Sequence, residues 1–115
     1  MYKMSYAEIM EGSPHEQREK EKAALDRAIA LMTAAEAKEV NISEVGDAVA
    51  YVQKLWTFFI ENLSDPRNEL SDELKRDLIA IGVWAVAESD RILANPSKSF
   101  SALIDVNKMI RDGLA

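Results

Sequence analysis

Residues 43–66 read SEVGDAVAYVQKLWTFFIENLSDP. Ser43 predicts the start of a helix, because its hydroxyl can accept a hydrogen bond from a free N–H group of the first turn. Ser64-Asp65-Pro66 predicts the end, because proline cannot continue the hydrogen bonds of a helix. The apolar residues between these limits recur at helical spacing and share one face: Val45, Ala48, Val49, Val52, Leu55, Trp56, Phe59 and Leu63. We therefore expect an amphipathic helix that buries this face, with Trp56 and Phe59 at its centre.

Another helix is predicted upstream. Ser13-Pro14-His15-Glu16 has the pattern of a capping box, with proline at the first helical position, where its missing N–H costs nothing. The first turns, through Lys22, are almost wholly charged, and an apolar stripe follows before the helix fades near Lys38. The stripe consists of Leu25, Ala28, Ile29, Met32 and Ala35. Ser5-Tyr6-Ala7-Glu8 repeats the capping-box pattern and predicts a short helix near the N-terminus.

Two further helices are predicted downstream. Ser71 caps the first of them, and Asn95-Pro96 closes it after Ala94. One of its faces carries Leu74, Leu78, Ile81, Ala85 and Ile92, and a second stripe consists of Ile79, Val83 and Val86. Because its middle is apolar nearly all round, we expect this helix to be the central element, covered on several sides.

The last helix has its apolar residues on one side. They are Phe100, Leu103, Ile104, Ile110 and Leu114. Gly113 is suited to a left-handed stop near the end of this helix. Asn107 and Arg111 fall toward the apolar side, where an unpaired polar group is costly. We expect them to pair with chain ends within the bundle, the alternative being a pairing with a partner protein.

These segments predict an all-α protein, a small antiparallel helical bundle of about four main helices with a short N-terminal helix. No stretch shows the alternation that is typical of strands. Of the 115 residues, 48% are apolar and 30% are charged, a balance typical of one globular core. We therefore expect a single helical domain over residues 1–115.

Charge and composition argue against several classes of function. A net charge of -6 opposes nucleic-acid binding, which needs a surface rich in Lys and Arg to neutralise phosphates. The longest apolar stretch, Leu78 to Ala87, has about half the length of a membrane span, so we expect no membrane insertion. The absence of cysteine removes disulfides and thiolate chemistry. Met1 to Gly12 lacks the apolar run of a secretory signal, and a cytoplasmic protein is expected.

Few residues could support catalysis. His15 is the only histidine, and it falls in the first turn of a charged helix, where an exposed helix-start residue is more common than a general base. The four glycines do not cluster into a phosphate-binding loop. The acidic residues from Asp65 to Glu73 fit the preference of helix starts for negative charge better than they fit a calcium site. We expect no catalytic residue, no metal ligand and no cofactor.

Five apolar side chains are candidates for contact with a partner protein. Tyr51 and Phe58 lie roughly 120° from the centre of the buried face of their helix, so they either meet another helix or face solvent. Ile79, Val83 and Val86 form a second stripe, which either packs inside the bundle or is offered to a partner helix. These are our predicted partner-binding residues.

Motifs along nearly the whole chain resemble those of one family, the flagellar biosynthesis regulator FlaF. They are Tyr2 to Glu8, Ala24-Leu25-Asp26-Arg27-Ala28-Ile29, Leu55-Trp56-Thr57, Leu78-Ile79-Ala80-Ile81-Gly82-Val83-Trp84, Leu103-Ile104 and Ile110-Arg111-Asp112-Gly113-Leu114. The resemblance implies that the protein binds flagellin and promotes its synthesis or secretion, in opposition to the regulator FlbT. It supplies no catalytic or binding residue that can be transferred.

Three hypotheses follow. The first is a FlaF-like, non-catalytic chaperone or regulator that holds flagellin. The alternative is an RNA-linked translational regulator of flagellin expression, for which the net charge predicts no salt-dependent binding of RNA. The third is a small hydrolase, which would lose its activity on His15→Ala.

Overall fold

The computed structural model describes residues 14–36 and 39–113 of the chain. This part holds four helices, α2 (Pro14–Ala35), α3 (Ile42–Ser64), α4 (Asp72–Ala94) and α5 (Ser101–Gly113), and no strand. The predicted all-α class is therefore confirmed. The short helix predicted from Ser5 lies outside the described residues.

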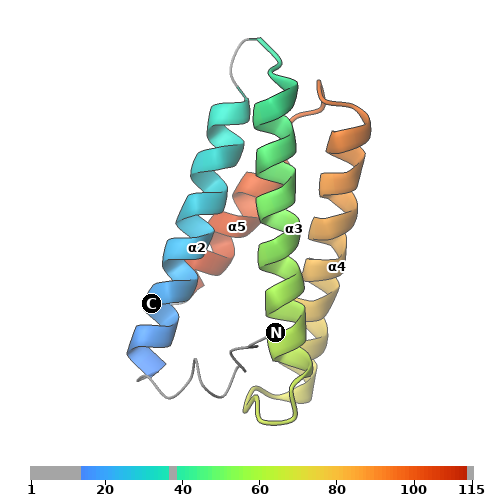
Figure 1. The fold of residues 1–115 in the computed structure, drawn as a ribbon. Coiled ribbons are helices and arrows are strands. Elements are labelled where there is room, and N and C mark those ends of the chain that lie inside the picture. Colours follow the sequence, from blue (N-terminus) through green and yellow to red (C-terminus); the bar gives the residue numbers. More distant parts are fainter. Residues whose placement is uncertain (1–13, 37–38, 114–115) are drawn as a thin grey trace, which may run out of the picture.

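The helices form a row of three with a fourth behind it (Figure 1). α2, α3 and α4 stand side by side with α3 in the middle, and each runs in the opposite direction to its neighbour. α5 crosses at a slant behind α2 and α3. α3 packs against both α2 and α4, whereas α5 packs mainly against α2. The predicted antiparallel bundle is confirmed in this form.

α3 is the central helix, so the expectation that the helix after Ser71 would be central is wrong. The predicted face of α3 is buried, with Trp56 only 1% exposed and Phe59 9% exposed. Of the residues described in α4, only Ala85 and Ile92 belong to the hydrophobic core. The physical reason is that α4 packs on α3 and has only marginal contact with α5, which leaves much of its apolar surface uncovered.

Side chains cap the starts of α3 and α4. At α4 the predicted cap is confirmed, because Ser71 Oγ accepts a hydrogen bond of 3.2 Å from the N–H of Leu74. At α3 the cap is Asn41 instead of the predicted Ser43, and its Oδ1 accepts a hydrogen bond of 3.2 Å from the N–H of Glu44. Asn and Ser are about equally good caps, so the helix begins at the earlier one.

Most helix ends lie where the sequence predicts them. α3 ends at Ser64 and α4 at Ala94, each just before its proline segment. α2 ends at Ala35, before the predicted Lys38. Gly113 is the last residue of α5, but the prediction of a left-handed stop is wrong, because the helix keeps its right-handed backbone through this residue and no positive φ occurs there.

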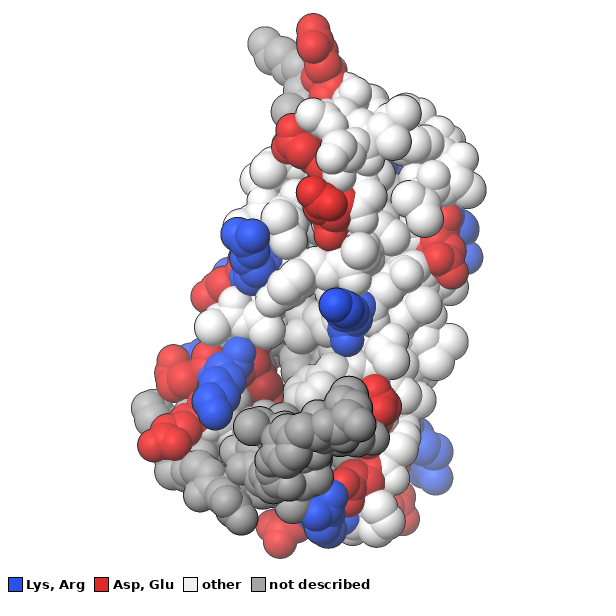
Figure 2. All heavy atoms as spheres, in the orientation of Figure 1, with Lys and Arg blue, Asp and Glu red and all other residues white. Residues whose placement is uncertain are grey.

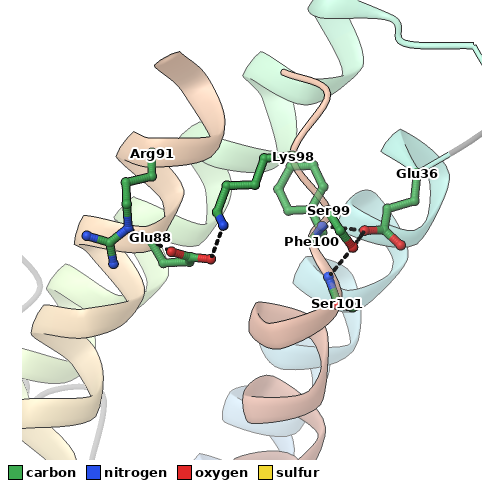
Figure 3. Close-up of polar contacts among 7 residues, drawn as sticks. All are labelled: Glu36, Glu88, Arg91, Lys98, Ser99, Phe100 and Ser101. Atoms are coloured by element: carbon green, nitrogen blue, oxygen red, sulfur yellow. Dashed lines mark hydrogen bonds and ion pairs between the residues drawn. The ribbon is translucent and has the colours of Figure 1, made fainter. Parts of the chain in front are cut away.

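Glu36, directly after α2, holds the start of α5 (Figure 3). One oxygen of its carboxylate accepts a hydrogen bond of 2.7 Å from the hydroxyl of Ser99 and another from the N–H of Phe100. Phe100 is 1% exposed, and a buried backbone N–H needs such a partner. A carboxylate also suits the positive end of a helix. Glu36 therefore fixes the place of α5 beside the end of α2.

Glu88 of α4 holds the same segment from the other side (Figure 3). It accepts a hydrogen bond of 2.8 Å from Nε of Arg91, and its second oxygen lies 3.5 Å from Nζ of Lys98. The hydrogen bond from Arg91, with the charge of Lys98, keeps the pKa of Glu88 below its ordinary value. Two cations thus compensate a carboxylate that is only 7% exposed.

The polar residues on the apolar side of α5 find partners within the bundle, as expected, but these partners lie on α3 and α2 and not at chain ends. Asn107 is fully buried, and its side-chain oxygen accepts a hydrogen bond of 3.2 Å from the indole N–H of Trp56. Its amide nitrogen donates to the carbonyl of Leu103 at 2.7 Å. Arg111 pairs with Asp26 of α2 at 3.1 Å. These bonds tie α5 to both α3 and α2.

Candidate partner-binding surfaces

α3 and α4 lie close together at Gly82. A methyl group at this position would lie 2.9 Å from Cγ1 of Ile60 and 3.2 Å from Cε3 of Trp56, so a larger residue would collide with α3. Farther along α4, the side-chain nitrogen of Gln53 donates hydrogen bonds to Ser89 Oγ at 2.9 Å and to Asp90 Oδ1 at 2.6 Å. These contacts define the sides of α3 and α4 that face each other.

Tyr51 and Phe58 lie on the side of α3 that faces away from α4. They precede Gln53 and Ile60, which contact α4, by two positions each, which is about 200° around a helix. Phe58 is 36% exposed, and its ring centre lies 6.3 Å from that of Phe59. Tyr51 is half-buried and packs against the core. The structure thus brings these two candidates to one side of α3, with Phe58 as the open one.

Ile79, Val83 and Val86 lie on α4 beside the surface that contacts α3. Val83 is 58% exposed, whereas Ile79 and Val86 are half-buried and Val86 packs against the core. By helical spacing, Val83 is turned about 100° from Gly82 and the other two about 40–60°, which explains the difference. The stripe is therefore partly in the bundle and partly offered to solvent. It lies on the opposite side of α3 from Tyr51 and Phe58, so the five candidates form two separate patches.

The sequence interpretation missed Leu93, which extends the stripe and is 49% exposed. Ile79, Val83, Val86, Asp90 and Leu93 follow one another at alternating distances of four and three residues. This spacing is how one helix presents a seam to another helix. Asp90 interrupts the apolar pattern, so the sequence alone did not show that the stripe continues to Leu93. We call Ile79, Val83, Val86 and Leu93 the α4 strip.

The α4 strip lies in a weakly charged part of the surface. Figure 2 shows mostly uncharged atoms over α4 and the adjoining side of α3, whereas acidic and basic residues crowd the lower end of α2. Ala80, Ala87 and Ala94 flank the strip on the side away from α3. An apolar area of this kind on a protein surface is typical of a site of protein contact.

A hollow between α2 and α5 has a different character. Its volume is about 420 Å³, and it is lined by Glu19, Lys22, Ala23, Asp26, Arg111 and Asp112. Arg111 pairs with Asp26 and with Asp112, each at 3.1 Å. The hollow is therefore a charged depression whose charges compensate one another, unlike the apolar pockets that bind small molecules.

The remaining sequence expectations concern catalysis, metals and membranes. Within residues 14–36 and 39–113, no group of three His, Asp or Glu side chains could hold a metal ion. None of the helices described combines the length and the apolar character needed to cross a membrane. His15 lies in the first turn of α2, as predicted.

Comparisons with known proteins identify the family. A search of curated proteins and a search of solved structures each found no match. A family model described as flagellar protein FlaF matches residues 2–114, nearly the whole chain. The match includes every motif on which the resemblance rested, from Tyr2 to Leu114. The chain therefore belongs to the FlaF family of flagellar proteins.

Proposed function

We propose that this protein is a non-catalytic regulator of flagellum biogenesis, which binds flagellin in the cytoplasm and promotes its synthesis or secretion. Membership of the FlaF family supports a role in the flagellum. The observation that carries the binding role is the α4 strip, in which Val83 is 58% and Leu93 49% exposed. Apolar side chains that a rigid helix holds in solvent are suited to a protein partner.

Two patches are available for such a partner. The α4 strip would accept apolar side chains that an amphipathic segment presents at helical spacing. Phe58, beside the half-buried Tyr51, would serve as an aromatic anchor on the other side of α3. Full burial of a side chain as large as Val or Phe contributes roughly 1.5–3 kcal/mol before the costs of association. A few such anchors are enough for a reversible complex.

Co-purification tests the proposal. The tagged protein is produced together with the flagellin of the same organism, and recovered flagellin is quantified for the wild type, Val83→Asp and Phe58→Asp. We expect flagellin with the wild type and a loss with Val83→Asp, because a carboxylate cannot be buried in an apolar contact without a partner. Met109→Asp is the matched control, because Met109 is 70% exposed on α5.

The outcomes separate the site from the function. No association of wild-type protein with flagellin under any condition would overturn the proposal. A loss with Phe58→Asp alone would move the site from α4 to α3. Circular dichroism of each variant shows whether it keeps its helices, so unfolding is not mistaken for lost binding.

The link with FlbT and the level of control belong to the same proposal. Deletion of this protein should lower the amount of exported flagellin, and removal of FlbT should counteract the effect if the two regulators oppose each other. Direct action on the flagellin message is the alternative. The net charge of -6 disfavours it, and a salt-dependent titration with that RNA should show no binding.

A further inference from the structure

We propose that in the absence of flagellin the centre of the α4 strip, formed by Ile79, Val83 and Val86, is covered by the α4 helix of a second copy of this protein. The two α4 helices would run antiparallel, with a two-fold axis near Val83. Such an interface is isologous, which means that each patch must complement itself. The pattern of charge and size from Arg76 to Asp90 meets this condition.

The charges are placed symmetrically about the centre of the strip. Arg76, Val83 and Asp90 are spaced seven residues apart, so they form one line along α4. With the two-fold axis at Val83, Arg76 of each copy meets Asp90 of the other, and Val83 meets its own equivalent. The acidic residue that interrupts the apolar spacing thus gains a partner, and two ion pairs bracket an apolar centre.

The sizes of the flanking residues are also self-complementary. On the side nearer α3, the same two-fold axis places Ile79 opposite Val86 of the second copy. On the other side it places Ala80 opposite Ala87. Bulky aliphatic residues thus meet each other along one edge, and small residues let the helices approach closely along the other edge.

The charged residues are available for this pairing. Arg76 is exposed, and its side chain makes no hydrogen bond or ion pair with the described part of the chain. Asp90 is exposed, and the side chain of Gln53 donates a hydrogen bond of 2.6 Å to one of its carboxylate oxygens. That bond holds the carboxylate at the edge of the strip, where an arginine from outside can reach it.

The pairing should be weak and reversible. About four turns of one helix from each copy bury far less than the roughly 1,600 Å² of a standard interface. A dissociation constant on the order of 100 μM is therefore expected. If the proposed function is right, flagellin competes with the second copy for the strip, so this consequence rests on the proposed function. The pairing itself does not depend on flagellin.

A charge exchange tests the pairing in solutions without flagellin. Sedimentation velocity is measured from about 10 μM to 1 mM for the wild type, Arg76→Asp, Asp90→Arg and the double variant. In each single variant both Arg76–Asp90 contacts of the dimer become contacts between like charges. The dissociation constant of the dimer should therefore rise about tenfold. The double variant restores both pairs and the wild-type affinity. A mixture of the two single variants should form heterodimers, because their charges then match.

Control variants separate this contact from general charge effects. Arg27→Asp on α2 and Asp105→Arg on α5 change the net charge by the same amounts at exposed positions and should dimerise like the wild type. Val83→Asp should abolish the dimer.

Three results would overturn the proposal. They are a wild type that stays monomeric up to about 1 mM, single variants that dimerise like the wild type, and a mixture that does not recover the dimer. Recovery in the mixture cannot come from misfolded chains. Because flagellin is absent, none of these results bears on whether the protein binds flagellin.

Discussion

α3 and α4 are two helices of 23 residues each that lie side by side, yet they differ in how much of their apolar surface is buried. Nine residues of α3 are buried, and most of them are large and apolar. Five residues of α4 are buried, and three of these are Gly82, Glu88 and Ser89. α4 nevertheless contains the longest apolar run of the chain, from Leu78 to Ala87. An apolar run therefore does not by itself identify the helix at the centre of a fold.

The position of each helix in the bundle explains the difference. α3 has α2 on one side, α4 on the other and α5 behind it, so a wide face is covered. α4 stands at the end of the row and touches mainly α3. It is attached to α3 by the close contact at Gly82 and by the hydrogen bond from Gln53 to Ser89, and Glu88 ties it to Lys98 in the segment that leads to α5. Several of its aliphatic residues, above all Val83 and Leu93, thus remain exposed.

The two tryptophans provide the strongest test of this comparison. Trp56→Ala should lower the free energy of unfolding by about 3–5 kcal/mol, because it leaves a cavity and removes the partner of Asn107. Trp84→Ala should lower the free energy of unfolding by about 1–2 kcal/mol, because this half-buried side chain is already partly exposed to water. Urea denaturation measures both. Equal losses would contradict the view that α3 carries the core.

Two helical glycines, Gly82 in α4 and Gly46 in α3, test the close contact. Gly82→Ala gains about 1 kcal/mol of helix propensity but overpacks against Ile60 and Trp56 at a cost of about 1–3 kcal/mol. We expect a net loss of about 1 kcal/mol. Gly46→Ala is the control, because nothing lies within 4 Å of the added methyl group, and it should stabilise by up to about 1 kcal/mol. Stabilisation by both changes in thermal unfolding would show that α4 does not need this close approach.

Glu88 tests the polar attachment of α4 through pH. Near neutral pH, Glu88→Gln should cost about 0.5–1 kcal/mol, because the ion partners Arg91 and Lys98 are themselves largely exposed. The pKa of Glu88 is lowered in the folded state, so its stabilisation is complete above the ordinary value of 4.5 and is lost as the pH falls through the lowered pKa. The stability difference between wild type and variant should therefore stay constant down to about pH 4.5 and then shrink. A difference that grows in acid would be inconsistent with this.

The smallest expected effect comes from a valine-to-alanine change on α4, which is compared with the same change on α3. Val83→Ala should leave stability unchanged or raise it by up to about 0.5 kcal/mol, because alanine favours the helix and little packing is lost at an exposed position. Val52→Ala, at a fully buried site of α3, should be clearly destabilising. Parallel denaturant titrations measure the two changes. A marked loss with Val83→Ala would mean that the α4 strip supports the fold of the isolated chain.

Much of the fold could be predicted from local patterns. Some features depend only on residues close together in the chain, so they can be predicted from one sequence. They are the helix ends at Asp65-Pro66 and Asn95-Pro96, the cap at Ser71 and the buried face of α3. The start of α3 was predicted two residues late, because two residues near it can both act as caps. Gly113 fits a left-handed stop by composition, but the helix continues through it.

The candidate site was less predictable. Spacing alone correctly separated Phe58 from the core residues Trp56 and Phe59. It could not decide how much of the second stripe of α4 would be covered, and Asp90 masked its continuation to Leu93. Burial of these residues depends on which helices stand next to α4. That neighbourhood is set by contacts between residues far apart in the chain.

The sequence by itself determined the helical class, the limits of most helices, the core face of α3 and the family. These properties follow from hydrogen bonds and apolar spacing within one or two turns, or from motifs along the chain. The tertiary structure alone decided that α3 is central, that Gly82 sets the contact with α4, and that Val83 and Leu93 remain exposed. The physical reason is that an apolar residue is buried only when another element covers it. Helical periodicity gives the direction of a side chain, but it does not give the neighbour that it meets.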